Sequence, residues 1–219
     1  MRKLGYCVFA SSLIAGIAFA YTDSALGPLA SHTGAPAVGA KPEETNCTLC
    51  HFNVDWNNLN TKGGAVEILG LPKGYMAGQT YPLTVRLHSD STAAYATRKW
   101  GFQISAVRAS DGEGSGTFQV ASDSIQVLSG DPGPYASRWY VEHAINGTRA
   151  GLFGPVTWTF DWHAPNPPEG KVYFFAAGNA ADGTQDPGND FVFTTADSVA
   201  DATVPVRAVS WGALKTRYR

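Results

Sequence analysis

The chain has 219 residues, of which 44% are hydrophobic, and its formal net charge is −2 at pH 7. This length allows one domain of β-sandwich size with appendages, and the hydrophobic content is sufficient for a proper core. The near-neutral charge and the absence of a basic run argue against a nucleic acid or an anionic membrane surface as partner.

Residues 1–20 are typical of a secretory signal peptide. Two basic residues precede an apolar run that ends in Ala18-Phe19-Ala20, a small-x-small cleavage site. A transmembrane anchor is the alternative, but the apolar run is shorter than the roughly 20 residues that span a bilayer. We therefore expect cleavage after Ala20 and export to the periplasm, the extracellular space or the cell surface, with no membrane span in the mature chain.

The next segment, residues 21–64, is rich in Gly, Ala, Pro and Ser without a period and predicts an irregular arm. It contains Cys47-Thr48-Leu49-Cys50-His51, the spacing that attaches a c-type haem. In such sites each thiol forms a thioether with a haem vinyl group, and the histidine becomes the proximal iron ligand. The sequence thus predicts one covalent haem c on Cys47 and Cys50, with His51 on the iron.

Three other uses of the two cysteines compete with haem attachment. A structural zinc site needs four closed ligands, and the sequence offers no second close pair of cysteines or histidines. A redox dithiol normally opens a helix within a βαβ pattern, which is not apparent here. A structural disulfide would leave His51 without a role. Cleavage of the signal peptide also removes Cys7, so that both remaining thiols belong to the motif.

Residues 65–200 predict an all-β fold with two antiparallel sheets. Short runs of β-branched and aromatic residues alternate with Gly, Pro, Asp and Asn at intervals of about 8 to 15 residues, as in β-sandwiches. Period-two alternation places Leu83, Val85, Leu87, Trp158, Phe160 and Trp162 on core faces. The predicted strands are Ala65–Leu69, Thr80–His88, Lys99–Ala109, Gly116–Val120, Ser124–Leu128, Ser137–Ala144, Val156–Trp162, Lys171–Gly178 and Phe191–Ala196.

The final segment, residues 201–219, is predicted to contain a short basic amphipathic helix. Trp211, Leu214 and Tyr218 recur at helical spacing, and basic residues lie between and after them. Such a tail either docks its aromatic stripe on the sandwich or serves in sorting or partner binding.

Several segments between residues 33 and 196 carry a family resemblance. They are Thr33-Gly34-Ala35-Pro36, the haem motif, Leu71-Pro72-Lys73-Gly74-Tyr75, Tyr140-Val141-Glu142-His143, Phe160-Asp161-Trp162-His163 and Ala176-Ala177-Gly178-Asn179. Together they resemble the bacterial reeler-like proteins, secreted proteins grouped as choice-of-anchor domain V and related to the reelin N-terminal domain. The resemblance implies an immunoglobulin-like β-sandwich with a haem-binding motif at its entrance.

A six-coordinate haem needs a second axial ligand, for which the mature chain offers four further histidines and one methionine. His143 is favoured because it closes an aromatic strand, which presents a ligand rigidly, and because it lies in a segment that carries the resemblance. His88 and His163 alternate with core residues and are expected to face solvent. His32, in the arm, and Met76, in a Gly-flanked turn, remain open alternatives.

One loop gathers acidic and amide side chains beside glycines. Its members are Asn179, Asp182, Asp186, Asn189 and Asp190. Oxygen ligands in such a loop can hold calcium, but ordinary turn chemistry places the same residue types beside glycine.

The leading functional hypothesis is an exported monohaem protein that passes single electrons to a redox partner protein. No Gly-x-Ser-x-Gly, His-Glu-x-x-His or P-loop motif points to an enzyme, although a haem enzyme such as a peroxidase is a third possibility. The alternative from another class is a cell-surface interaction module that binds a glycan or a protein, with the haem structural or sensory.

Overall fold

The computed structural model describes residues 27–52, 59–61, 63–184, 186 and 188–202. The predicted signal peptide and the predicted C-terminal helix lie outside these residues. In the described part of the chain, no helix is long and apolar enough to cross a membrane.

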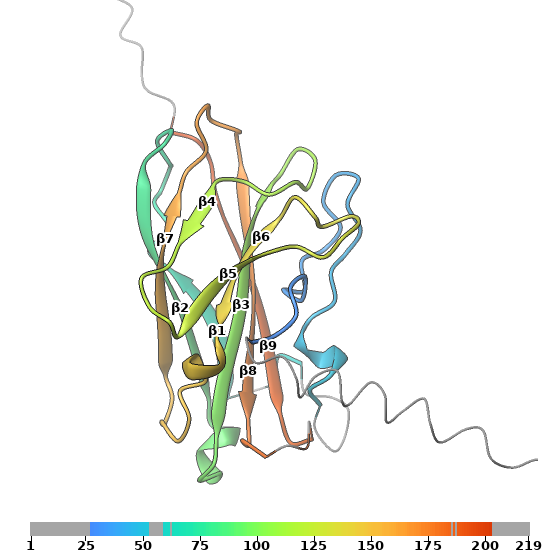
Figure 1. Ribbon diagram of the computed structural model, residues 1–219, viewed down its shortest axis with the longest axis vertical. Helices are drawn as coiled ribbons and strands as arrows, with labels where there is room; N and C mark the ends of the chain where they lie inside the picture. Colours follow the sequence, from blue (N-terminus) through green and yellow to red (C-terminus); the bar gives the residue numbers. More distant parts are fainter. Residues whose placement is uncertain (1–26, 53–58, 62, 185, 187, 203–219) are drawn as a thin grey trace, which may run out of the picture.

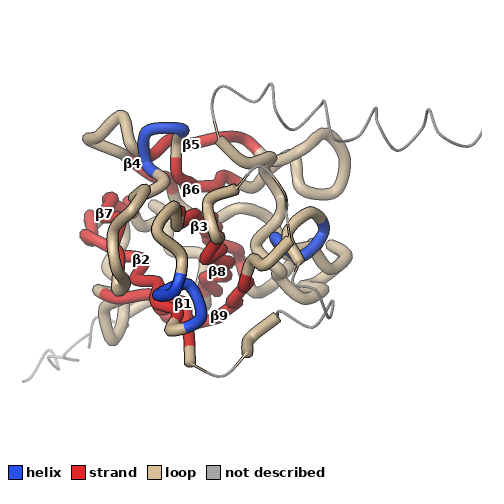
Figure 2. Tube along the Cα trace, turned by 90° about the horizontal axis from the view of Figure 1, so that it is seen from below, coloured by secondary structure: helices blue, strands red, loops and turns tan. Residues whose placement is uncertain are grey.

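The described residues form a two-layer antiparallel β-sandwich, which confirms the predicted immunoglobulin-like, all-β architecture (Figure 1). One sheet has the order β1-β2-β7-β4 and the other the order β5-β6-β3-β8-β9. Figure 2, turned by 90°, shows the two layers and the arm segments outside them. The strands are β1 (Gly64–Leu69), β2 (Thr80–Ser89), β3 (Lys99–Arg108), β4 (Thr117–Gln119), β5 (Ile125–Ser129), β6 (Trp139–His143), β7 (Val156–His163), β8 (Val172–Ala181) and β9 (Phe191–Val199).

Every predicted strand is present, with ends that differ by a few residues. The largest difference is at the C-terminal ends of β8 and β9, which run on to Ala181 and Val199. The two strands pair along almost their whole length, from Val172 opposite Val199 to Ala180 opposite Phe191. Because of this pairing, both strands continue through small and polar residues, where the alternation of apolar and polar residues in the sequence is no longer clear.

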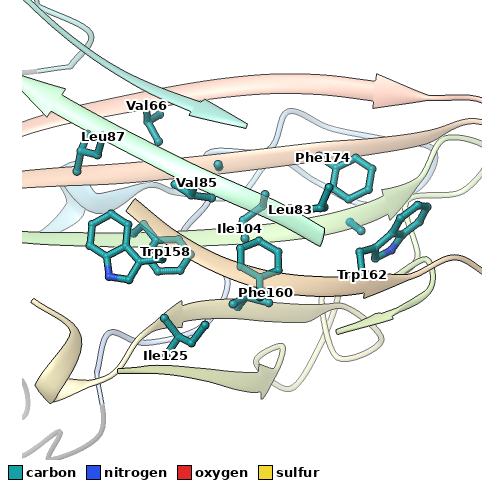
Figure 3. Close-up of a cluster of buried hydrophobic side chains, with 14 of the residues drawn as sticks. Val66, Leu83, Val85, Leu87, Ile104, Ile125, Trp158, Phe160, Trp162 and Phe174 are labelled. Atoms are coloured by element: carbon teal, nitrogen blue, oxygen red, sulfur yellow. The ribbon is translucent and has the colours of Figure 1, made fainter. Parts of the chain in front are cut away.

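The main core lies between the two sheets and consists of the side chains that alternation places inward (Figure 3). Leu83, Val85 and Leu87 are fully buried, and the three aromatic residues of β7 are at most 3% exposed. Phe102 of β3 stacks on Trp158, with 4.6 Å between the ring centroids. The predicted inward faces of β2 and β7 are therefore confirmed.

The arm lies on the outer face of the five-stranded sheet. It folds back on itself as a hairpin, with bridges between Thr33 and Asn46 and between Val38 and Lys41. A second, smaller apolar cluster holds it to the sheet. The cluster joins Ala35 and Val38 of the arm to Val107 and Phe175 of the sheet, with Tyr173 beside them. Directly after the hairpin, the chain makes the 3-10 turn η1 (Cys47–Leu49).

Candidate haem site

The cysteine motif is wound into the η1 turn. Asn46 caps the turn, because its side-chain oxygen accepts a hydrogen bond from the Thr48 N–H at 2.9 Å. The N–H groups of Cys50 and His51 both donate to the Cys47 carbonyl, at 3.2 and 2.9 Å. Because side chains three residues apart eclipse in a 3-10 turn, both thiols lie on the same side of it. This is the arrangement that two attachment points on one porphyrin require.

The surroundings of Cys47 disfavour a thiolate. Burial raises the pKa of this thiol to about 12, and the neighbouring Cys50 and the Glu142 carboxylate raise it as well. Thiolate zinc ligands and redox dithiols depend on lowered pKa values. A thioether sulfur carries no charge and suits the same surroundings.

The His51 imidazole is oriented by a buried carboxylate. Its Nδ1 donates to Oδ2 of Asp190 at 2.5 Å, and Asp190 is only 2% exposed. The other oxygen of Asp190 accepts the Asp182 N–H at 3.1 Å, which fixes the carboxylate in turn. Histidines that bind metals typically donate their second ring N–H to such a group. Because Nδ1 is engaged by Asp190, a metal bound by His51 would use Nε2.

The His143 imidazole is held against β3, at the point where β6 ends. Its Nδ1 lies 3.1 Å from the Phe102 N and 3.2 Å from the Phe102 carbonyl oxygen. A Cβ on Gly101 would come within 2.5 Å of Cε1 and 2.9 Å of Nε2, so glycine leaves room for the ring. The Phe102 N–H donates to Nδ1 in the tautomer that carries its proton on Nε2. In the other tautomer Nδ1 donates to the Phe102 carbonyl, and the lone pair of Nε2 would be left for a metal.

Burial lowers the pKa of His143 to about 4, with a smaller lowering from the charge of His51. The ring is therefore neutral at pH 7, as a metal ligand must be. His143 as an iron ligand stays a prediction.

Asn179 connects the two histidines across the sheet. Gly101, beneath the His143 ring, pairs with Asn179 on β8. A hydrogen bond from the Asn179 side chain lowers the pKa of Asp190, although burial raises that pKa overall. Oδ1 of Asn179 is buried and has no hydrogen-bond partner. A buried polar atom without a partner between two candidate ligands fits a site that is completed by a bound group.

Three leucines of the arm are exposed. Leu49, inside the motif, is 60% exposed, while Leu29 and Leu59 are 49% and 41% exposed. The Leu29 carbonyl accepts a hydrogen bond from Gln103 on the outer face of β3, and Leu59 forms a bridge with Val192 on the edge strand β9. An apolar macrocycle attached at the cysteines would cover Leu49.

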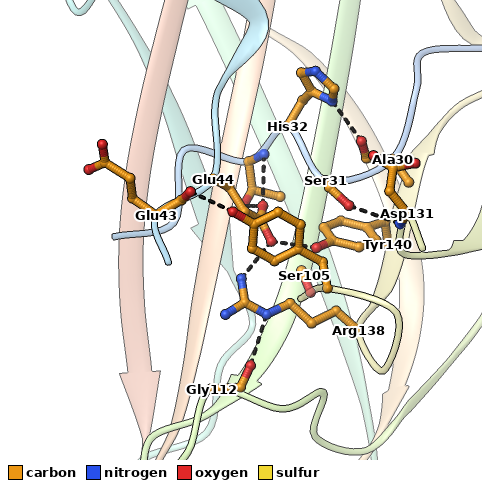
Figure 4. A network of polar contacts seen from close by, with 12 residues as sticks. Ala30, Ser31, His32, Glu43, Glu44, Ser105, Gly112, Asp131, Arg138 and Tyr140 are labelled. Carbon is orange, nitrogen blue, oxygen red and sulfur yellow. Dashed lines mark hydrogen bonds and ion pairs between the residues drawn. The ribbon is translucent and has the colours of Figure 1, made fainter. Parts of the chain in front are cut away.

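A buried polar network fixes the arm just before the motif (Figure 4). Nη1 of Arg138 donates to Oε1 of Glu44 at 2.5 Å, and both side chains are fully buried. The Tyr140 hydroxyl donates to the same Glu44 oxygen, and the Thr33 hydroxyl donates to the other at 2.5 Å. Glu44 precedes Cys47 by three residues, so the network sets where the motif begins.

The other candidate axial ligands are placed differently. His32 lies in the arm, with Nδ1 donating to the Ala30 carbonyl at 2.6 Å. His88 and His163 belong to the four-stranded sheet, away from the arm, and Nδ1 of His163 bonds to the Thr80 hydroxyl at 2.6 Å. Met76 is 46% exposed in the turn before β2. Only His32 and His143 share the outer face with the motif.

The acidic loop acts through turn chemistry. Asp182 accepts hydrogen bonds from both the N–H and the hydroxyl of Thr184, and Asp186 accepts the N–H of Gly188. Asp190 is committed to His51. Among the described residues, no group of three or more His, Cys, Asp or Glu side chains could hold a metal ion by itself.

Sequence reasoning proposed the motif and His143 as site residues, but it missed the residues that position them. Asp190 appeared only as a member of the acidic loop, and Gly101 and the Glu44–Arg138 pair did not appear.

No family model matches the chain, and no curated protein matches it. Among solved structures it is similar to a human F-spondin reeler domain, at 17% identity over 64% of this chain and 93% of that one, with a TM-score of 0.40. The Reelin-N domain of F-spondin has 14% identity over 71% and 95% of the two chains, with a TM-score of 0.42. A cohesin module from Clostridium perfringens has 10% identity over 64% and 98%, with a TM-score of 0.40. Identities and TM-scores this low transfer no function, so the fold assignment rests on the strands and sheets described above.

Proposed function

We propose that the protein is an exported monohaem electron carrier, with haem c on Cys47 and Cys50 and with His51 and His143 as axial ligands. One observation carries the proposal. The His51 ring, which directly follows the cysteine turn, is oriented through Nδ1 by the buried Asp190 carboxylate, and a second, neutral imidazole, that of His143, is held by the Phe102 backbone. A zinc, thiol-redox or disulfide role for the cysteines would leave this second, neutral histidine without a purpose.

When bound, the haem would supply a one-electron iron couple. The chain supplies rigid ligands, because Asp190 fixes the His51 ring and the β3 backbone fixes the His143 ring. Occupation of both axial positions by protein nitrogens favours electron transfer over the binding of a small substrate. Leu49, which is exposed inside the motif, marks the surface on which a redox partner protein would dock.

The assignment of His143 is tested by replacing it in the exported, haem-bearing protein. His143→Ala should keep the haem bound through the cysteines but open the sixth position, so that the ferric spectrum shifts from low spin towards high spin. Carbon monoxide should then bind readily to the reduced protein. His163→Ala is the matched control, because that ring ends a strand of the other sheet and should leave the spectrum unchanged.

A low-spin spectrum that survives in His143→Ala would contradict the assignment of this ligand. His32→Ala is measured in parallel, because His32 is the other histidine in the arm. If His32→Ala loses the low-spin form, His32 is the sixth ligand.

A second candidate function is a cell-surface interaction module, and three exposed apolar side chains between β6 and β7 favour it. Ile145, Leu152 and Phe153 are 58%, 55% and 69% exposed in the segments between β6 and β7. Co-sedimentation with cell-envelope preparations tests it. An interaction module should bind equally well after Cys47→Ala/Cys50→Ala and should lose binding after Leu152→Glu/Phe153→Glu, whereas an electron carrier without such a role should not co-sediment.

A further inference from the structure

A cavity of about 320 Å³ lies beside the four-stranded sheet. It is formed by the end of β2, the first residues of β3 and the segment just before β7, and no residue of the haem motif lines it. Its volume falls at the lower end of the range for small-molecule sites, roughly 300 to 1,000 Å³.

The cavity contains a buried hydroxyl that lacks a partner. Ser89, the last residue of β2, is 7% exposed and lines the cavity. Its Oγ forms no hydrogen bond in the described structure. Leaving such a group without a partner costs about 1 to 3 kcal/mol, so a bound molecule that offers a hydrogen bond here would be favoured.

One wall of the cavity is rigid and partly aromatic. Arg98 is 4% exposed, and it donates from Nε to the Thr92 carbonyl at 3.1 Å and from Nη1 to the Gly151 carbonyl at 3.2 Å. Its guanidinium lies 3.9 Å from the centroid of the Phe153 ring. Trp100, also in the lining, donates from Nε1 to the Leu152 carbonyl at 3.0 Å. These contacts fix the wall before any ligand arrives.

Both guanidinium groups of the lining already have partners. Arg86 donates from Nε at 2.6 Å to Oε2 of Glu67, which lies outside the lining, and Arg98 donates to the two carbonyls named above. Asp90 is the one carboxylate in the lining, and an added anion would compete with the contacts that the guanidinium groups already make. A neutral ligand whose hydroxyls both donate and accept matches guanidinium, carboxylate and serine together.

We propose that this cavity binds one neutral sugar unit, with its hydroxyls on Ser89, Arg86 and Asp90 and an apolar ring face against Phe153. Aromatic side chains beside a few fixed polar groups are the usual composition of small-ligand sites. The proposal gives the second candidate function a specific site, rests on that function, and is independent of the haem.

The test is titration of the exported, haem-bearing protein with neutral monosaccharides and disaccharides, followed by calorimetry or by NMR of the indole N–H of Trp100. A panel of small carboxylates is titrated in parallel. We expect saturable binding of at least one neutral saccharide and none of the carboxylates. Phe153→Ala and Ser89→Ala should each weaken binding, the former about tenfold. Ile145→Ala, which changes an exposed apolar residue outside the lining, is the control and should bind as the parent does.

The proposal is overturned if no saccharide binds, if carboxylates bind in place of saccharides, or if both cavity variants bind as the parent does. Thermal melts of both variants exclude unfolding as the cause of a loss. If the protein co-sediments with cell-envelope preparations but binds no saccharide, the sugar site is contradicted while the interaction module is still supported.

Discussion

The two faces of the five-stranded sheet are both buried, but by different means. On β3 the inward side chains, such as Phe102 and Ile104, join the apolar core between the sheets. The outward side chains Gln103 and Ser105 are equally buried, at 1% or less, and make hydrogen bonds. The arm causes this difference, since it covers an outer face that would otherwise meet water.

The two kinds of burial have different consequences for the fold and for the position of the arm. Apolar burial between the sheets is non-directional and holds the fold together. Buried hydrogen bonds and ion pairs are directional and costly to break, so they specify where a segment lies. The candidate haem site is built on the second kind of contact, through Glu44, Arg138, Asp190 and the backbone of Phe102.

The largest expected effect comes from the inner core. Phe160→Ala removes a ring that is 3% exposed and should lower the free energy of unfolding by about 3 to 5 kcal/mol. Thr159→Ala, on the exposed face of the same strand, should cost less than about 1 kcal/mol. Denaturant unfolding measures both. Equal costs for the two variants would show that the core is not where the structure places it.

Breaking the arm network should cost less globally and act locally. Arg138→Met leaves the Glu44 carboxylate buried without its cation, and should destabilise the protein by about 3 kcal/mol. Amide hydrogen exchange should increase first in residues 33–46, while β2 and β7 stay protected. Glu44→Gln/Arg138→Met should recover part of the loss, because no buried charge remains. Uniform exchange throughout both sheets would contradict the separation of the two faces.

Filling the space beneath His143 should have a smaller effect, of about 1 to 3 kcal/mol. A Cβ at Gly101 would lie 2.5 Å from the imidazole Cε1, so Gly101→Ala must displace the ring and should also shift the ferric spectrum towards high spin. Gly74→Ala is the control, since its new Cβ would meet nothing closer than 3.3 Å. A parent-like spectrum in Gly101→Ala would mean that the position of this ring does not control the iron.

The smallest effect is expected where the tip of the arm meets the end of β3. Arg108 bonds both oxygens of Asp111, at 2.9 and 2.7 Å, and this hydrogen bonding lowers the pKa of Asp111 below its ordinary 3.8. A lowered pKa contributes stability above pH 3.8 that is lost as the pH falls through the folded-state pKa. Asp111→Asn should therefore cost less than about 1 kcal/mol at pH 7. The difference from the parent should shrink as the pH falls below 3.8, and a difference that stays constant with pH would contradict the ion pair.

The inner face could be predicted from the sequence because its signal is local. Alternation alone placed Trp158, Phe160 and Trp162 in the core, and spacing alone identified the cysteine motif. His143 was proposed because a strand pattern ends there, and its role as a ligand stays a prediction. The outer face of β3 and β8 gave no such signal, since its residues are mostly small or polar and are buried by a segment far away in the chain.

The contacts that complete the site are the most remote in sequence. Glu44 and Arg138 are 94 residues apart, and His51 and Asp190 are 139 apart. No periodicity in one sequence joins such pairs, because topology decides which loops and edges meet. Asp190 was therefore interpreted as a turn or calcium residue, although its partner in the structure is the histidine of the motif.

The most direct test of the central claim is the intact mass of the protein, exported from a host that matures c-type cytochromes, together with a pyridine haemochrome spectrum. The account predicts the processed chain plus one haem that survives acid extraction, and a haemochrome spectrum typical of two thioether bonds. A mass equal to the processed chain alone, with Cys47 and Cys50 recovered as free thiols or as a disulfide, would contradict it.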